Sequence, residues 1–373
     1  HEAPWLLFPP QEESKRKTIC TLLNLEANRV IKFKDLPKVY ANGCCVGSSH
    51  GWLVFLDEQV TPFLLNPFTQ ERIQLPSIAN FLCISKIDKN CEGEFVVDFT
   101  YRDRFGSCHL SRVETKQLRE SFVHKAILSS SPKFRSNTCE VVMIYGLNSK
   151  LAYYKSGEES WNDLDGKHAH YCDILFNKNK LYALSNGGFI EVWDFDGGVP
   201  IKRMDINLSF EGTKEAEFLT KELYARTVYL VESCGDILLV VRYIGELVNE
   251  AGQPVYEADL YTKEDTHPLV CPYRTLKFYV HKLDFNEGKW VEVDSLGNQT
   301  LFLGGNHSLS ISNSRIKKNS IYFIDDYWMR MNEDYLYGGH DMGVFSLKDQ
   351  HVKPFCTYPS EKIHPPPCWI APN

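Results

Sequence analysis

The chain has 373 residues, of which 43% are hydrophobic and 13% aromatic, and its formal net charge is −7. This composition is typical of a folded globular protein and excludes a disordered or collagen-like chain. The acidic balance, without a long basic block, disfavours a nucleic-acid partner. No apolar run approaches the roughly 18 residues that a membrane span needs, so we also expect no membrane partner.

Twelve cysteines are scattered along the chain without a C-x-x-C motif. Several lie within or beside apolar runs, where a reduced cysteine behaves as a small hydrophobic residue. We therefore expect free thiols and an intracellular protein, in the cytoplasm, the nucleus or both. The sequence begins at His1 and shows no signal peptide, so we expect the natural N-terminus and its targeting information to lie upstream.

The first elements, within residues 5–34, are two or three expected strands that do not complete a four-stranded unit. The next stretch, residues 43–76, does complete one. Four short, mostly apolar segments alternate there with turn residues such as Gly51 and the segment NPFTQ. A sheet this small does not bury both faces alone, so we expect similar sheets elsewhere in the chain.

Approximate copies of this unit follow, each with two apolar strands, a polar turn and a strand rich in Val, Tyr and Phe. Divergent four-strand repeats of roughly 40–50 residues are typical of a β-propeller, in which each repeat is one blade. A β-sandwich is the alternative, but sandwich strands seldom group in fours. The expected blades after 43–76 are residues 122–165, 171–206, 226–296 and 300–356.

A propeller closes its ring, usually with one blade built from both ends of the chain. The last residues, CWIAPN at 368–373, read as one strand, so we predict that they join residues 1–34 in a shared blade. Residues 1–373 then form a single all-β propeller domain with six blades favoured. Residues 77–121 keep seven blades possible, because CISKID and EFVVDFTYRD are either two strands of a further blade or parts of a long connector.

Four long insertions interrupt the blades. In an antiparallel meander, second-to-third connections and blade-to-blade connections open on the same face, so all four insertions should decorate one face of the disc. Long loops on a rigid scaffold are where binding usually resides. Residues 208–225 favour helix by composition. The insertions are residues 77–121, 207–225, 245–275 and 327–340.

The insertion at 327–340 is unusually rich in aromatic residues and Met, and it contains an Arg. These residue types are enriched in the cores of protein interfaces. The alternative is that their side chains fold back over the edge of a blade. We predict contacts with a protein partner here and in parts of 245–275. The predicted contact residues are Tyr327, Trp328, Met329, Arg330, Met331, Tyr335 and Tyr337.

Two short motifs suggest chemistry at first sight. Ser48-Ser49-His50 offers a nucleophile and a base, but successive strand side chains point to opposite faces and no G-x-S-x-G elbow is present. We interpret it as a turn. Asp163 and Asp165 resemble part of a calcium loop, but a Trp occupies the first ligand position and the closing glutamate is missing.

His168, His170 and Cys172 alternate, which on a strand places three zinc-compatible side chains on one face. No fourth ligand is indicated by spacing, so we favour an ordinary strand entry. Several aspartates suggest a glycosidase-like carboxylate pair, but spacing does not establish one, and we interpret them as turn formers. We predict no metal, no cofactor and no catalytic residues. The aspartates are Asp284, Asp325, Asp326 and Asp341.

Two runs of sequence are specific enough to compare with known families. One comprises GSSHGW, LLNPFT and RIQLP within residues 47–76, and the other is KWVEVDSLGNQTLFLGG at 289–305, followed by KNSIYFIDD and DMGVFSLKD. They resemble a plant family that carries the domain of unknown function 295, is often attached to an N-terminal F-box and is described as kelch-like. The similarity extends from about residue 4 to residue 356.

The resemblance implies a substrate receptor of a Skp1–cullin–F-box ubiquitin ligase. In such a receptor the F-box binds a Skp1-like adaptor and the propeller holds a protein client, whose identity stays open. One branch of the family is associated with brassinosteroid signalling and a glycogen-synthase-kinase-like client. The family supplies no catalytic residues.

No F-box precedes Trp5, so residues 1–373 are not expected to dock onto the adaptor by themselves. Either an F-box lies upstream, or this member is an F-box-less scaffold, which in relatives implies an organelle. A further alternative is a propeller enzyme or small-molecule sensor with its site in the central channel.

Overall fold

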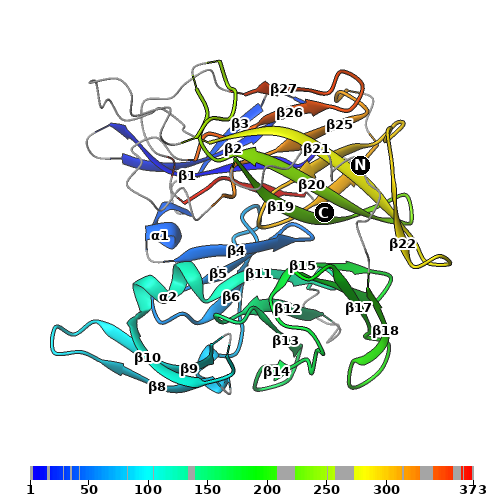
Figure 1. Cartoon of the computed structure of the whole chain (residues 1–373). Helices are drawn as coiled ribbons and strands as arrows, with labels where there is room; N and C mark the ends of the chain where they lie inside the picture. Colours follow the sequence, from blue (N-terminus) through cyan, green and yellow to red (C-terminus); the bar gives the residue numbers. More distant parts are fainter. Residues whose placement is uncertain are drawn as a thin grey trace. The chain divides into compact units, whose positions relative to one another are not determined.

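The structure of the chain is a computed structural model, and strands with the turns between them make up nearly all of what it describes (Figure 1). The described residues are 3–14, 17–27, 29–33, 36–41, 43–81, 83–103, 105–132, 139–207, 223–249, 251–256, 273–312, 315–327, 339–355, 363 and 365–371.

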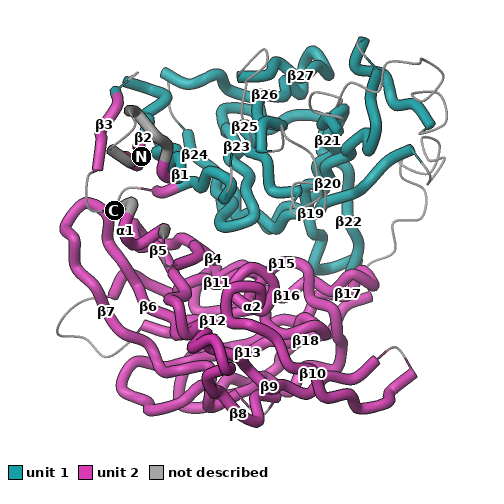
Figure 2. The backbone as a smooth tube through the Cα atoms, turned by 90° about the vertical axis from the view of Figure 1, so that its left-hand side faces the viewer, with its two compact units in different colours: residues 1–9, 23–29, 208–369 teal, residues 10–22, 30–207, 370–373 magenta. Residues whose placement is uncertain are grey.

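The chain divides into two compact units, coloured separately in Figure 2. The single-domain organisation expected from the sequence stays a prediction. The first unit comprises residues 1–9, 23–29 and 208–369, and the second comprises residues 10–22, 30–207 and 370–373.

Three four-stranded antiparallel sheets form most of the second unit, and in each the strands lie side by side in chain order. The first contains β4 (Cys44–Ser49), β5 (Trp52–Leu56), β6 (Pro62–Leu65) and β7 (Arg72–Gln74). The second contains β11 (Val123–Leu128), β12 (Glu140–Tyr145), β13 (Lys150–Lys155) and β14 (Asn162–Asp163). The third contains β15 (Tyr171–Asn177), β16 (Lys180–Ser185), β17 (Phe189–Asp194) and β18 (Ile201–Asn207).

Tight hairpin turns set the register of these sheets. Ser49 pairs with Trp52, so His50 and Gly51 form a two-residue turn between β4 and β5. Both have positive φ, of 50° and 76°, as a type I′ hairpin requires. Ser49 Oγ accepts a hydrogen bond from the backbone N–H of Leu128 at 3.2 Å. The Ser-Ser-His motif is therefore part of a hairpin, as its interpretation as a turn anticipated.

The first strands of the three sheets, β4, β11 and β15, are neighbours (Figure 1). A Cβ atom on Gly47 of β4 would lie 1.9 Å from the carbonyl oxygen of Ala126 in β11, so only glycine permits this approach. On the other side of β11, the ammonium of Lys125 forms a buried ion pair with Asp173 of β15. Successive four-stranded sheets thus pack through their first strands.

Residues 77–121 form a separate three-stranded sheet with the order β10-β9-β8. The sequence suggests either two strands of a seventh blade or a long connector, and the three-stranded sheet matches neither fully. This sheet lies between β7 and β11 in the chain, yet it does not separate β4 from β11. That arrangement favours an inserted sheet over a seventh blade, and the six-blade count stays a prediction. The elements are η1 (Ile78–Asn80), β8 (Ile84–Lys89), β9 (Phe95–Arg102), β10 (Cys108–Glu114) and α2 (Thr115–Ser121).

The first unit contains one four-stranded and one five-stranded sheet, with orders β19-β20-β21-β22 and β24-β23-β25-β26-β27. The four-stranded sheet contains β19 (Tyr224–Ser233), β20 (Asp236–Gly245), β21 (Arg274–Asp284) and β22 (Lys289–Glu292). The five-stranded sheet contains β23 (Thr300–Leu303), β24 (Leu309–Ile311), β25 (Ser320–Phe323), β26 (Gly343–Ser346) and β27 (His351–Pro354).

One pairing in the five-stranded sheet departs from a simple meander. β23 and β25 are parallel, with Thr300 opposite Ser320, whereas β24 pairs antiparallel with the other edge of β23. Parallel neighbours need a connection of about a dozen residues or more. Residues 304–319 supply that length.

Both ends of the chain contribute to one further sheet, with the order β28-β1-β2-β3. The expected strand near Trp369 therefore pairs beside β1, as predicted for the closing blade. Residues 208–222, 257–272 and 328–338 lie outside the described residues, and with them most of three expected insertions. The elements of this region are β1 (Trp5–Ser14), β2 (Lys17–Asn24), β3 (Arg29–Phe33), α1 (Leu36–Ala41) and β28 (Cys368–Ile370).

Candidate functional site

Of the seven contact residues predicted by name, the structure describes Tyr327, which lies four residues after β25. Of the predicted contact region 245–275, it describes residues 245–249, 251–256 and 273–275. The Tyr327 backbone N–H donates to Asp325 Oδ1 at 3.2 Å and its hydroxyl donates to Glu246 Oε1 at 3.2 Å. Its ring packs edge-on against Tyr273, with centroids 5.6 Å apart. The other predicted contact residues lie outside the described residues: Trp328, Met329, Arg330, Met331, Tyr335 and Tyr337.

Asp325 and Tyr273 connect the two sides of the segment 328–338. The Asp325 carboxylate accepts hydrogen bonds from the Tyr273 hydroxyl at 2.7 Å and from the Asp341 backbone N–H at 3.1 Å. The Tyr273 hydroxyl in turn accepts from the Gly339 N–H at 3.3 Å. Residues just before and just after the segment are thus held by the same buried pair.

Arg242 of β20 is fully buried and interacts electrostatically with Asp325. Its Nη1 donates to Asp326 Oδ1 at 2.8 Å, its Nη2 to Asp341 Oδ2 at 2.9 Å, and its Nε to Thr275 Oγ1 at 2.7 Å. Burial alone lowers the pKa of the guanidinium. Tyr229 and the carboxylates of Asp326 and Asp341 raise that pKa by more than burial lowers it, so Arg242 stays charged.

Burial also makes the Asp325 carboxyl a weaker acid than an ordinary aspartate. Desolvation, and then the nearby charge of Asp341, raise its pKa to about 6, against the opposing effects of the Tyr273 hydrogen bond and the Arg242 charge. A buried carboxyl near a second carboxylate is expected to behave in this way.

The buried aspartates therefore form a hydrogen-bonded framework that holds the backbone in place. The structure brings three of the four aspartates noted in the sequence, Asp325, Asp326 and Asp341, around Arg242. Their oxygens accept hydrogen bonds from Arg242, Tyr273 and backbone N–H groups, which fixes the backbone on either side of 328–338. Asp284 lies apart and accepts hydrogen bonds from the turn that follows it.

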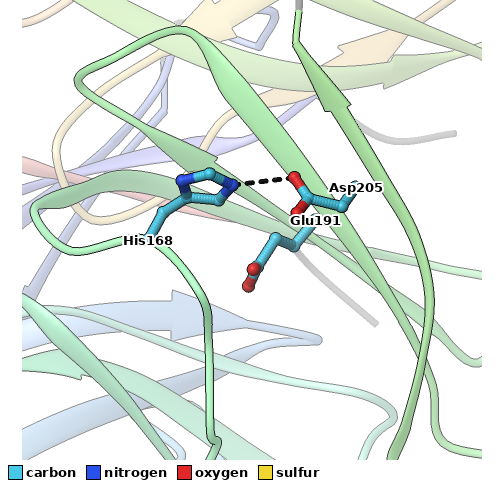
Figure 3. A group of neighbouring side chains, drawn as sticks. All are labelled: His168, Glu191 and Asp205. Carbon is cyan, nitrogen blue, oxygen red and sulfur yellow. Dashed lines mark hydrogen bonds and ion pairs between the residues drawn. The ribbon is translucent and has the colours of Figure 1, made fainter.

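A second cluster lies in the second unit and joins His168, Glu191 and Asp205 (Figure 3). One ligand-type atom of each lies within 4.8 Å of the others. The imidazole Nε2 of His168 is 2.7 Å from Asp205 Oδ1, and the His168 ring stacks on Phe189 with centroids 4.0 Å apart. Burial raises the pKa of Asp205, but the hydrogen bond and charge of His168 and Lys167 outweigh it and lower that pKa.

The three alternating residues singled out from the sequence do not form this cluster. β15 begins at Tyr171, so His168 and His170 precede the strand and strand alternation does not relate them to Cys172. Cys172 Sγ instead contacts the carbonyl oxygen of Leu184. Glu191 and Asp205 were missed because they lie 23 or more residues beyond His168, and only the pairing of β17 with β18 brings them together.

In the Asp163–Asp165 motif, Asp163 has a structural role. Asp163 belongs to β14, and its carboxylate accepts a hydrogen bond from the Tyr145 hydroxyl at 2.6 Å.

Among the described residues, no helix is long and apolar enough to cross a membrane.

Comparison with protein families identifies the fold directly. Residues 22–346 match the model of the KIB1-4 beta-propeller. The chain belongs to this β-propeller family. The predicted fold class is thereby confirmed, and the four-stranded antiparallel sheets have the form of propeller blades.

Curated relatives of the chain are F-box proteins of Arabidopsis thaliana. The putative F-box protein At4g22660 is 24% identical over 340 residues, covering 88% of this chain and 76% of the relative. The F-box/kelch-repeat protein KIB1 is 24% identical over 347 residues, covering 92% and 71%. The F-box protein SKIP23 is 25% identical over 351 residues, covering 88% and 76%.

Proposed function

We propose that this chain is the client-binding module of a Skp1–cullin–F-box ubiquitin ligase. The observation that carries the proposal is that a family match over residues 22–346 coincides with relatives named as F-box proteins. The propeller holds the protein to be modified, an F-box binds the Skp1-like adaptor, and other subunits transfer ubiquitin. The chain itself is not an enzyme in this account. Kinship with the plant family of the domain of unknown function 295 forms part of the same proposal.

The client contact is proposed for residues 327–337. Binding costs less conformational entropy when the contacting groups are held in place beforehand. In the first unit, the hydrogen bonds of Asp325 to Tyr327 and of Tyr273 to Gly339 hold the backbone on both sides of that segment. The ion pairs of Arg242 with Asp326 and Asp341 hold the residues that precede and follow segment 328–338.

Affinity capture from plant extract tests the proposal. One bait is the chain 1–373, and a second carries Trp328→Ala, Tyr335→Ala and Tyr337→Ala. The matched control is Phe105→Ala, because Phe105 is an exposed aromatic residue on the hairpin between β9 and β10. We expect the first bait and the control to retain a partner that the triple variant loses. The circular dichroism spectrum and melting temperature of the triple variant should be unchanged.

The ligase link needs a second readout. We expect the captured client to accumulate in plants that lack this protein, and a proteasome inhibitor to abolish the difference from wild-type plants. A client whose abundance is the same in both plants would contradict the ligase role, even if the binding itself is confirmed.

A further inference from the structure

Two acidic side chains face each other across neighbouring strands in the second unit. Glu191 of β17 and Asp205 of β18 are direct cross-strand partners. Like charges directly opposite each other destabilise a sheet, and the Glu191 side chain is fully buried, which increases the cost of an uncompensated charge. This position therefore favours a cation close to both carboxylates.

We propose that His168, Glu191 and Asp205 form a binding site for a divalent transition-metal ion, with Zn²⁺ as the best match. One imidazole and two carboxylates are ligand types that zinc accepts, and three protein ligands plus water are a common zinc arrangement. The imidazole contributes Nε2 without its proton, so the hydrogen bond to Asp205 is exchanged for bonds to the metal.

The geometry fits after small movements. Ligand atoms about 2.0–2.2 Å from one zinc ion lie at most about 4.4 Å apart, close to the 4.8 Å that encloses the three groups. Tetrahedral coordination spaces ligand atoms by about 3.4 Å, so His168 Nε2 and Asp205 Oδ1, now 2.7 Å apart, must separate slightly. His168 lies in the connection before β15 and the two acids lie on strands, so the histidine can supply this movement (Figure 3).

Neighbouring hydrogen-bond donors orient the Glu191 carboxylate. The Tyr171 hydroxyl donates to Glu191 Oε2 at 2.5 Å and the Lys167 backbone N–H donates to Oε1 at 2.8 Å. Burial and the Glu191 hydrogen bond raise the pKa of Tyr171, so it remains a donor. Partners of this kind orient metal ligands in known sites.

Two lysines supply the positive charge when no metal is bound. The Lys202 ammonium is 3.1 Å from Glu191 Oε1, and the Lys167 ammonium is 3.4 Å from Asp205 Oδ2. The Lys202 side chain is 29% exposed and the Lys167 side chain 70% exposed, so both can turn outward into water. Lys202 is the stronger competitor, because its partner is the buried carboxylate.

Isothermal titration calorimetry with ZnCl₂ on metal-stripped, tag-free chain tests the site. Cys91, Cys108 and Cys234 are exposed and are changed to Ser in every sample, because thiolates also bind zinc. The variants are His168→Gln, Asp205→Asn and Lys202→Met, and His170→Gln is the matched control. MgCl₂ serves as the control ion, because Mg²⁺ prefers oxygen ligands in octahedral geometry.

We expect one zinc ion per chain, about tenfold or more weaker binding in the His168 and Asp205 variants, and unchanged binding in the control. Lys202→Met removes the competing ammonium while keeping its alkyl chain, so zinc should bind more tightly. Melting temperatures measured without zinc verify that the variants are folded. Equal affinities in wild type and Asp205→Asn, or the absence of stoichiometric zinc in both wild type and Lys202→Met, would overturn the proposal.

Discussion

The hydroxyl of Tyr273 donates a hydrogen bond to Asp325 Oδ2 at 2.7 Å and accepts one from the backbone of Gly339 at 3.3 Å. Tyr273 is the residue before β21, and Asp325 follows β25, so this pair joins the two sheets of the first unit. The same pair defines the ends of the segment proposed to contact the client.

Changing Tyr273→Phe should destabilise the chain while keeping the ring that packs on Tyr327. The variant leaves the buried Asp325 oxygen and the Gly339 N–H without this partner, which costs about 1–3 kcal/mol. Urea unfolding followed by circular dichroism measures the change. Tyr256→Phe is the control because Tyr256 is exposed, and an equal response of the two variants would show that the bridge contributes nothing.

Changing Arg242→Met should be the most damaging charge substitution in the first unit. It leaves the buried carboxylates of Asp326 and Asp341 without their cation, and removal of one partner from a buried ion pair costs about 3–5 kcal/mol. Arg112→Met is the comparison, because the Arg112 side chain is 54% exposed and 3.5 Å from Asp98, so this pair should contribute about 1 kcal/mol or less. A variant of Arg242 as stable as the Arg112 variant would contradict the buried framework.

The stability of the chain should depend on pH through Asp325. Its pKa is raised from an ordinary value of 3.8 to about 6 in the folded chain, so ionisation is less favourable in the folded state than in the unfolded state. The contribution of Asp325 to the free energy of unfolding is therefore greatest below about pH 4 and decreases as the pH rises to about 6.

Asp325→Asn removes this ionisation and provides the test. The stability advantage of wild type over the variant should shrink between about pH 4 and pH 6 and then level off. Urea unfolding of both proteins across this range measures the difference, and an advantage that grows with pH would refute the assignment.

Gly47→Ala should disrupt the contact between β4 and β11. The new Cβ would lie 1.9 Å from the Ala126 carbonyl oxygen, so the strands must separate. Overpacking of this kind costs about 1–3 kcal/mol or more. Gly198→Ala is the control, since a Cβ there meets nothing within 4 Å, and thermal unfolding should distinguish the two variants by several degrees.

The repeating sheets could be predicted because their signals are local. Apolar strand segments, the turn at Gly51 and the four-strand rhythm all act within a few tens of residues. The parallel pairing of β23 with β25 could not be predicted, because a parallel partner depends on a crossover that has no short sequence signature. The three-stranded sheet β8–β10 was only partly anticipated, since the exposed β10 lacks an apolar strand pattern.

The clusters around Arg242 and Glu191 were missed for a related reason. Each is a charged residue inside an apolar strand, and its partners come from other parts of the chain. Asp326 and Asp341 lie in the connections after β25 and before β26, whereas Asp205 lies opposite Glu191 on β18. Arg242 within DILLVVRYIG is a signal that a buried partner must exist, but the sequence does not indicate which aspartate supplies it. Tyr327 was selected by composition alone, and its anchoring to Asp325 depends on the fold.

The dissociation constant of a purified, captured client tests the central claim most directly. It is measured for the chain 1–373, for the folded triple variant with Trp328→Ala, Tyr335→Ala and Tyr337→Ala, and for Phe105→Ala. We predict that the triple variant binds at least about tenfold more weakly, a loss of about 1.4 kcal/mol, and that the Phe105 variant binds like wild type. The same dissociation constant for all three proteins would contradict the proposed client surface.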